Sequence, residues 1–256
     1  DRKLKFKIVI PARFGSSRLP GKPLLDIAGQ PMIWHVYQRA LSTNIGNENI
    51  VIATDNTDIE KIAKAFGANV VITAVEHESG TDRLAEVVTK LGWNEDEIIV
   101  NLQGDEPLIS PDLIAFTAKT LSDSDAGMST LACPLDDEAQ LHDVNCVKLV
   151  CDSTNKAMYF SRAAIPFARD GVENSLFNSE DNPWLRHIGM YAYRVSTLKL
   201  LSKLPVTVLE ELEKLEQLRG LWHGITIQVA RINQAPGHGV DTLEDLNRVR
   251  AIIERD

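Results

Sequence analysis

The fold class follows from one stretch near the start of the chain, Phe6-Lys7-Ile8-Val9-Ile10-Pro11-Ala12-Arg13-Phe14-Gly15-Ser16-Ser17-Arg18-Leu19-Pro20-Gly21-Lys22. Its first seven residues form a short apolar run of the kind expected for a buried strand. The run ends in a loop rich in Gly, Ser and Pro, and an amphipathic helix is predicted over residues 31–41. Strand, loop and helix in this order predict the first unit of an α/β fold.

The same order repeats through the first half of the chain. The predicted elements are strands over residues 50–54, 68–73 and 98–102, helices over 58–66 and 81–91, and a helix opened by Pro111. We therefore expect a Rossmann-like α/β fold with a mostly parallel sheet. Ligands of such sheets bind beyond the carboxyl ends of the strands, which would place residues 13–22 and Asp105 in one crevice.

The pattern changes near Gly127, where strand-like runs follow one another with few helices between them. The further predictions are strands over residues 128–132, 147–151, 157–161, 188–195 and 225–232, and helices over 209–221 and 242–254. Residues 166–184 are predicted to form a long exposed loop, a lid or a partner contact. We expect a core of residues 1–126 and 225–256, with a smaller mixed β-rich lobe of residues 127–224.

The composition narrows the function classes. Acidic residues outnumber basic ones, and the net charge of -9 would repel nucleic acid and anionic membranes, so no nucleic-acid partner is expected. No apolar run approaches 18 residues, and the start Asp1-Arg2-Lys3-Leu4-Lys5 lacks the apolar core of a signal peptide. We therefore expect no membrane insertion and a cytoplasmic location. The three cysteines form no CxxC pair, which favours small core residues over a disulfide framework or a zinc site.

The loop after the first strand has the composition of a phosphate site. Arg13, Arg18 and Lys22 supply three cations, and two glycines allow backbone N–H groups to approach an anion. It is not a Walker loop, because five residues separate Gly15 from Gly21 and Pro23 stands where Ser or Thr would bind magnesium. A solvated turn is the alternative, and the position of the loop after a buried strand favours phosphate.

Asp105 follows another buried strand, in the turn Gln103-Gly104-Asp105-Glu106-Pro107. A carboxylate there can hold Mg²⁺ with few other protein ligands. Asp241 is its possible partner, although a residue just before Thr242 could instead help to cap a helix. Glu106 is a competing ligand, and spacing alone does not choose between the two.

Polar groups also interrupt two apolar segments late in the chain. In an alternating strand, His187, Gly189, Tyr191 and Tyr193 should point to one face. That face suits a sugar site, or it is simply the polar side of an amphipathic strand with a satisfied histidine. Glu216 and Gln217 leave the same choice open, because Glu and Gln on a helix are usually solvated.

Six blocks along the chain resemble the 3-deoxy-manno-octulosonate cytidylyltransferases over nearly the whole length. They are Arg13-x4-Arg18-Leu19-Pro20-Gly21-Lys22-Pro23-Leu24, Ser79-Gly80-Thr81-Asp82-Arg83, Gln103-Gly104-Asp105-Glu106-Pro107, His187-x-Gly189-x-Tyr191-x-Tyr193-Arg194, Leu215-Glu216-Gln217-Leu218-Arg219 and Val240-Asp241-Thr242. Each block alone is modestly specific, but six blocks in this order are hard to obtain by chance. The resemblance implies the nucleotide-diphospho-sugar transferase type of fold, a homodimer and a role in lipopolysaccharide biosynthesis. It also makes residues 127–224 the sugar-binding and dimerisation lobe.

The resemblance implies roles for individual residues. Arg13, Arg18, Lys22, Ser79, Gly80 and Arg83 would contact CTP. Asp105 and Asp241 would hold Mg²⁺ and, with Lys22, form the catalytic set. Gln103, Arg162, His187, Tyr191, Glu216 and Gln217 would surround the sugar acid (Kdo), with Arg162 facing its carboxylate. The anomeric hydroxyl of the sugar would then attack the α-phosphorus of CTP and release pyrophosphate, which requires positioning and charge but no protein nucleophile.

Three alternatives remain at this point. A CMP-sialate synthetase or a cytidylyltransferase for an amino-substituted Kdo would share the fold and the triphosphate loop. A nucleotide-binding module without turnover is disfavoured, because such a chain would be expected to lose Asp105, Asp241 or Lys22, and all three are present.

Overall fold

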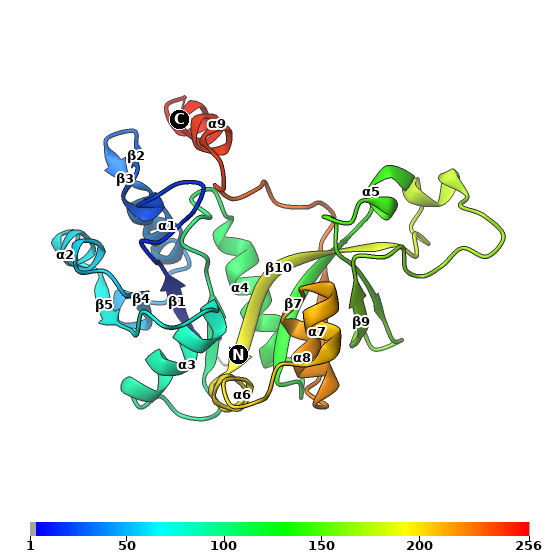
Figure 1. Cartoon of the computed structure of the whole chain (residues 1–256), viewed down its shortest axis with the longest axis horizontal. Helices are drawn as coiled ribbons and strands as arrows, with labels where there is room; N and C mark the ends of the chain where they lie inside the picture. Colours follow the sequence, from blue (N-terminus) through cyan, green and yellow to red (C-terminus); the bar gives the residue numbers. More distant parts are fainter. Residues whose placement is uncertain (1–3, 256) are drawn as a thin grey trace.

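The computed structural model describes residues 4–255, so Asp1 to Lys3, where no signal peptide is expected, lie outside the described residues. Within that range one sheet of nine strands has the order β11-β7-β10-β6-β1-β4-β5, with β8 added at β10 and β9 at β8. The strands are β1 (Lys7–Pro11), β4 (Ile50–Thr54), β5 (Asn69–Ile72), β6 (Ile98–Asn101), β7 (Met128–Pro134), β8 (Lys148–Cys151), β9 (Ala157–Ser161), β10 (Leu185–Arg194) and β11 (Ile227–Arg231). Strand β10 runs antiparallel to β6 and β7, whereas the other neighbours in this order are parallel (Figure 1). The predicted α/β class with a mostly parallel sheet is confirmed.

Helices cover both faces of this sheet because side chains alternate along its buried strands. Ile8 and Ile10 of β1 pack with α1, α2 and α4, while Val9 packs on the opposite face with α3 and α6. The helices are α1 (Met32–Leu41), α2 (Thr57–Ala65), α3 (Gly80–Lys90), α4 (Pro111–Ser122), α5 (Glu138–His142), α6 (Val195–Leu201), α7 (Val208–Glu213), α8 (Gln217–Trp222) and α9 (Leu243–Ile253). No helix within residues 4–255 has the length and apolar character to cross a membrane.

The second half of the chain joins the same sheet. Strands β7, β10 and β11 continue it, and only β8 and β9 extend beyond, as a small antiparallel pair beside one end of β10. Residues 127–224 therefore do not build a separate sheet, although their division from the core remains a prediction. The C-terminal segment then returns from β11, and α9 packs beside the small hairpin of β2 (Asp26–Ile27) and β3 (Gln30–Pro31) (Figure 1).

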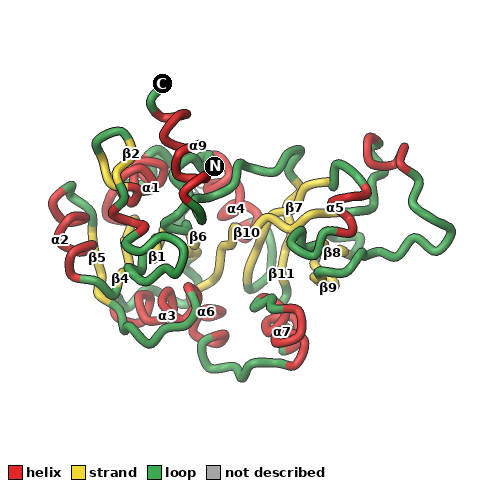
Figure 2. The backbone as a smooth tube through the Cα atoms, turned by 45° about the horizontal axis from the view of Figure 1, so that its top comes forward, coloured by secondary structure: helices red, strands yellow, loops and turns green. Residues whose placement is uncertain are grey.

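The loop predicted over residues 166–184 is long but only partly exposed. Figure 2 shows the connection between β9 and β10 running beyond the end of the sheet. Phe167 is 82% exposed, whereas Phe177 is buried and stacks on Trp184 at 4.9 Å between ring centroids. A short 3-10 helix, Asn174–Asn178, lies within it. The loop thus packs into a small apolar cluster shared with Leu135, Leu141 and Cys146, which its polar composition concealed.

The helix predicted over residues 209–221 is wrong in one respect, because it is two helices. Helix α7 begins at a capping box formed by Thr207 and Glu210, and it ends at Lys214, whose φ of 54° is left-handed. Helix α8 starts after Glu216. A lysine in this conformation is uncommon and gave no warning of the break. The sharp turn nevertheless determines where Glu216 and Gln217 lie.

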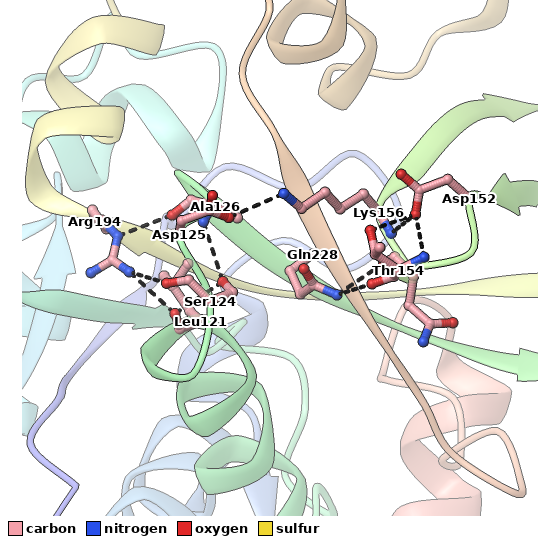
Figure 3. Close-up of polar contacts among 10 residues, drawn as sticks. Leu121, Ser124, Asp125, Ala126, Asp152, Thr154, Lys156, Arg194 and Gln228 are labelled. Atoms are coloured by element: carbon pink, nitrogen blue, oxygen red, sulfur yellow. Dashed lines mark hydrogen bonds and ion pairs between the residues drawn. The ribbon is translucent and has the colours of Figure 1, made fainter.

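Arg194 secures the end of β10, the strand that carries Tyr191 and Tyr193. Its guanidinium donates to the carbonyl oxygens of Leu121, Ser124 and Ala126 at 2.8–3.2 Å, and so satisfies the C-terminal end of α4 and the turn that follows it (Figure 3). Figure 3 also shows Lys156 paired with Asp125 nearby. The arginine that ends the block from His187 to Arg194 therefore has a structural role and lines neither the site of residues 13–22 nor that of Tyr191.

Candidate functional site

Two adjoining cavities lie where the strand ends and the following loops meet. The larger has a volume of about 340 Å³ and is lined by Pro11, Ala12, Arg13, Ser16, Ser17, Arg18, Lys22, Pro23, His77, Glu78, Ser79, Gly80, Arg83, Gln103, Gly104, Asp105 and Asp241. Every residue assigned to CTP or metal from the sequence is in this wall. The structure thus brings together side chains more than 200 positions apart in the chain.

Lys22 connects the charged residues that line the larger cavity. Its Nζ lies 3.0 Å from Oδ2 of Asp105, 3.4 Å from Oδ1 of Asp241 and 2.9 Å from the carbonyl oxygen of Val240. The loop reaches this position through a turn at Gly21, whose φ of 65° is left-handed, with the ring of Phe14 packed against it. One ammonium therefore joins the basic loop to both aspartates.

Backbone contacts set the spacing of the two aspartates. The N–H of Val240 donates to the carbonyl oxygen of Asp105 at 2.8 Å, so the two carboxylate-bearing segments are directly bonded. A Cβ at Gly104 would lie 2.8 Å from the carbonyl oxygen of Pro11, and one at Gly239 would lie 2.9 Å from that of Asp105. Neither position has room for a side chain. The aspartates are adjacent because the main chain is tightly packed around them.

The alternative role of Asp241 as a helix cap is taken by other residues. Thr242 is the N-cap of α9, and Asp245 completes the capping box and accepts from the N–H of Asp241. The Asp241 carboxylate is left 62% exposed and facing Lys22. Glu106, the competing ligand, does not line the cavity; burial, together with the charges of Asp105 and Asp241, raises its pKa to about 7.

The donor set fits a hard cation. Two carboxylates and an open cavity suit Mg²⁺, which usually takes one or two carboxylates and fills its remaining positions with water and substrate phosphate. Within residues 4–255 no group of three or more His, Cys, Asp or Glu side chains could hold a metal. The pair would therefore need phosphate oxygens to complete a metal site.

A loop between β5 and α3 forms the wall opposite the basic loop. Ser79 caps α3 by accepting from the N–H of Asp82 at 3.1 Å. Arg83 is 3% exposed and donates to Asp55 at 3.2 Å, so its charge is already paired although it lines the cavity. Glu86 holds the loop by accepting from the N–H of Ala74 at 2.9 Å and by pairing with His77.

His77 and Glu78 are cavity residues that the sequence reading missed. The available signal was their position immediately before Ser79, in the loop that precedes the helix. Binding residues often lie on such loops, at positions supported by a rigid scaffold. Sequence alone did not show that Glu86, nine residues further on, orients the His77 ring.

The smaller cavity, of about 160 Å³, continues from the larger one, and Gly80 and Gln103 line both. Its other lining residues are Thr81, Asn101, Met128, Gly189, Tyr191, Tyr193, Leu201, Glu216, Gln217, Arg219 and Gly220. Four of the residues assigned to the sugar are thus present: Gln103, Tyr191, Glu216 and Gln217. Burial raises the pKa of Glu216, opposed by its hydrogen bond to Thr81.

His187 does not line this cavity but packs against Tyr191, which does. Its ring packs between Phe160 and Tyr191, at 5.0 and 5.4 Å, and its Nε2 is 3.0 Å from Oγ1 of Thr130. Burial lowers its pKa to about 3, so the ring is neutral at pH 7. The predicted shared face is right, because Tyr191 also stacks on Tyr193, but the structure gives His187 the role of a satisfied histidine that supports Tyr191.

Arg162 is also away from both cavities. Its guanidinium donates to the carbonyl oxygens of Glu213 at 2.6 Å, Val144 at 2.9 Å and Lys214 at 3.4 Å. These bonds join β9 to the turn between α7 and α8. Arg162 lines neither cavity and stabilises the turn that places Glu216, and its contact with a sugar carboxylate stays a prediction.

Comparisons with known proteins agree with this geometry. A family model described as cytidylyltransferase matches residues 7–227. The chain belongs to the cytidylyltransferase family. It is 50% identical over 252 residues to a 3-deoxy-manno-octulosonate cytidylyltransferase of Aliivibrio fischeri (strain ES114), a match that covers 98% of this chain and all of the relative. It is 49% identical over 251 residues to the protein of the same name from Thioalkalivibrio sulfidiphilus, with 98% and 99% covered.

Solved structures of the family have the same fold. One is CMP:2-keto-3-deoxy-manno-octonic acid synthetase complexed with CTP, 42% identical, with a TM-score of 0.86 and coverage of 98% of this chain and 99% of that one. A cytidylyltransferase from Leptospira borgpetersenii is 19% identical, with a TM-score of 0.63 and coverage of 99% and 88%. At that identity the likeness shows the fold alone. The predicted family and its nucleotidyltransferase fold are confirmed.

Proposed function

We propose that this protein transfers the cytidylyl group of CTP to 3-deoxy-manno-octulosonate, giving CMP-Kdo and pyrophosphate. The observation that carries the proposal is the pair of adjoining cavities. The larger is lined by basic and acidic side chains that suit a metal-bound triphosphate, and the smaller by polar and aromatic side chains that suit a hydroxylated substrate. Relatives at about half identity over nearly the whole chain bear the name of this activity. Incorporation of the product into lipopolysaccharide is part of the proposal.

The larger cavity would take CTP. Arg13, Arg18 and Lys22 face a triphosphate from one side, and backbone N–H groups of their loop can approach it where glycine leaves room. As pyrophosphate leaves, it gains negative charge. Cations that are already fixed in place stabilise this charge best, because they need no reorganisation. This would account for the presence of three basic side chains in one loop.

Asp105 and Asp241 would hold Mg²⁺ in the larger cavity. When bound, the ion would polarise the α-phosphate and lower the pKa of the attacking hydroxyl. The protein's own contribution is to hold the two carboxylates side by side through the bond from Val240 to Asp105. Lys22, which pairs with both carboxylates, would turn towards phosphate oxygens once the carboxylates held a metal.

The smaller cavity would take the sugar acid. Because Gln103 and Gly80 line both cavities, a hydroxyl bound in the smaller cavity would lie close to a nucleotide bound in the larger one. Holding both substrates in contact converts a reaction between two molecules into one within a complex. No protein nucleophile is required for this direct transfer.

Pyrophosphate release is the direct test. The purified protein would be assayed with CTP and Mg²⁺ plus Kdo, an amino-substituted Kdo or sialic acid, each at several concentrations. The proposal expects the highest kcat/KM with Kdo. A higher kcat/KM with either of the other sugars would mean that this sugar, and not Kdo, is the substrate. Binding of CTP without turnover of any sugar would favour a non-catalytic module.

We further propose that the protein acts as a homodimer in the cytoplasm, where CTP is made. Exposed apolar side chains occur in the segments around β8 and β9, namely Val144, Met158 and Phe167, and at Leu212 of α7, the helix whose Glu213 bonds to Ser161 of β9. A second copy is the simplest partner for such a surface. Light scattering on the intact protein should give a mass of about twice 28.4 kDa, and Phe167→Glu should lower it towards one chain. A monomeric wild type would refute the dimer.

A further inference from the structure

Two residues that line the smaller cavity each carry a buried polar atom without a hydrogen-bond partner. The atoms are Oδ1 of Asn101 and the hydroxyl oxygen of Tyr191, and no other buried side-chain nitrogen or oxygen in residues 4–255 shares this state. Buried polar atoms are nearly always paired, because an unpaired one has given up its bonds to water without replacement. Two such atoms, on residues that line one cavity, point to a ligand that pairs them.

The two atoms are held on neighbouring strands. Asn101 is the last residue of β6 and lies directly opposite Tyr191 of β10 in the antiparallel pairing. Asn101 is 6% exposed, and Gly80 lies in ordinary contact with it, since a Cβ there would be 3.7 Å from its Nδ2. Tyr191 packs between the rings of His187 and Tyr193. The neighbouring hydroxyl of Thr130 already donates to the carbonyl oxygens of Ile188 and Met190.

The chemistry of the pair selects one kind of group. The carboxamide oxygen of Asn101 only accepts, whereas the phenol of Tyr191 donates and accepts. A hydroxyl that donates to Asn101 and accepts from Tyr191 satisfies both. Asn101 lines the smaller cavity and is absent from the wall of the larger one, so this hydroxyl belongs to the sugar and not to the nucleotide.

We propose that Asn101 is a substrate-recognition residue that binds a hydroxyl of the sugar acid together with Tyr191. The proposal rests on the proposed function, since it assigns the smaller cavity to the sugar. It adds a residue from the strand end before Gln103, one that no sequence block singled out. It also accounts for the unpaired oxygen, which is a cost to the free protein that the bound sugar removes.

The test combines kinetics with thermal unfolding for Asn101→Leu and the smaller Asn101→Ala. For both variants we expect the KM for Kdo to rise at least about tenfold while the KM for CTP stays within about twofold, because a site built around a hydroxyl loses its partner. Asn101→Leu should also keep or raise the Tm of the substrate-free protein, because it removes an unpaired buried oxygen. In a double-mutant cycle, Tyr191→Phe should be non-additive with Asn101→Leu.

Asn182 is the matched control. It is as buried as Asn101, but its Nδ2 donates to the carbonyl oxygens of Leu135 and Phe177 and its Oδ1 accepts from the N–H of Trp184. Asn182→Ala should lower the Tm and leave both KM values near those of the wild type.

Two results would overturn the assignment. One is an unchanged KM for Kdo in the Asn101 variants, and the other is a fall in Tm like that of Asn182→Ala with both KM values rising together. A wild type that binds CTP but turns over no Kdo would instead count against the proposed function, and the two failures are thereby distinguished.

Discussion

The ammonium of Lys22 lies 3.0 Å from the carboxylate of Asp105, although 83 positions of sequence separate the two residues. This ion pair joins the basic loop to the turn that follows β6. Asp241 also pairs with Lys22, at 3.4 Å. The single positive charge of Lys22 offsets part of the charge of the two adjacent carboxylates. Under the proposed function, both carboxylates would be free to hold a cation once Lys22 turned to phosphate.

Asp105→Asn should lower kcat by at least about a hundredfold with Kdo and CTP, because an amide is a poorer ligand for Mg²⁺ and leaves the developing charge less stabilised. The Tm should change little, since the carboxylate is partly exposed. Asp123→Asn, at an exposed surface ion pair, is the control and should retain full activity. Activity lost on chelation should return with added Mg²⁺ in the wild type. An Asp105→Asn enzyme with normal kcat would exclude this residue as a metal ligand.

Lys22→Ala should raise the KM for CTP about tenfold or more and also lower kcat, because the lysine both binds phosphate and stabilises the leaving group. Titration of CTP binding by calorimetry separates the two effects. Lys119→Ala removes a lysine from an exposed pair on α4 and should change neither constant. If CTP bound equally well to both variants, the phosphate role of Lys22 would be wrong.

Glu86→Gln should raise the KM for CTP several-fold and leave the KM for Kdo unchanged. The carboxylate anchors both the N–H of Ala74 and the ring of His77; although burial opposes ionisation, hydrogen bonds from Lys90, Ala74 and His77 lower its pKa to about 2. A neutral amide holds the loop less firmly. Glu60→Gln, in an i,i+4 pair on α2, is the matched surface change. An equal rise in the KM values for CTP and Kdo would point to a general loss of structure instead.

His187→Gln should reduce the dependence of stability on pH. Burial lowers the pKa of His187 from 6.5 to about 3, so the folded state binds fewer protons than the unfolded one between these values. Its contribution is complete above about pH 6.5 and is lost as pH falls towards 3. Between pH 6.5 and 5 the wild type should lose about 2 kcal/mol more unfolding free energy than the variant. Urea unfolding at both pH values measures this.

The surface change His142→Gln serves as the comparison for that experiment, because His142 is exposed on α5. It should reproduce the pH dependence of the wild type. A wild-type curve that coincides with that of His187→Gln over this interval would mean that His187 accepts a proton in the folded protein.

The first half of the fold was predictable because its strands are buried on both faces and its helices are amphipathic. Ile8, Val9 and Ile10 are all apolar for this reason, whichever face they meet. The phosphate loop could be found because strand order dictates which loops share an edge. The pairing of Asp105 with Asp241 could only be proposed, since spacing of 136 residues carries no geometry.

The features that the sequence did not reveal have a common cause in contacts between distant segments. Arg162 looked available for a carboxylate, yet the carbonyl groups of Glu213 and Lys214 lie within its reach. Asn101 lay inside a predicted strand, and its unpaired oxygen became visible only in the structure. The left-handed Lys214 broke a helix that its sequence favoured. Each depends on tertiary packing, which periodicity does not encode.

The return of the chain from β11 to α9 means that Asp241 is joined covalently to the sheet by a single exposed segment. Residues 233–239 contain no regular element, while all nine strands of the described sheet precede them. Cutting the chain in this segment would leave a complete sheet holding Asp105 and a short fragment holding Asp241. The protein could therefore be divided there into two pieces whose reassembly, through α9 and the Val240 contact, would be reported by the enzyme's own turnover.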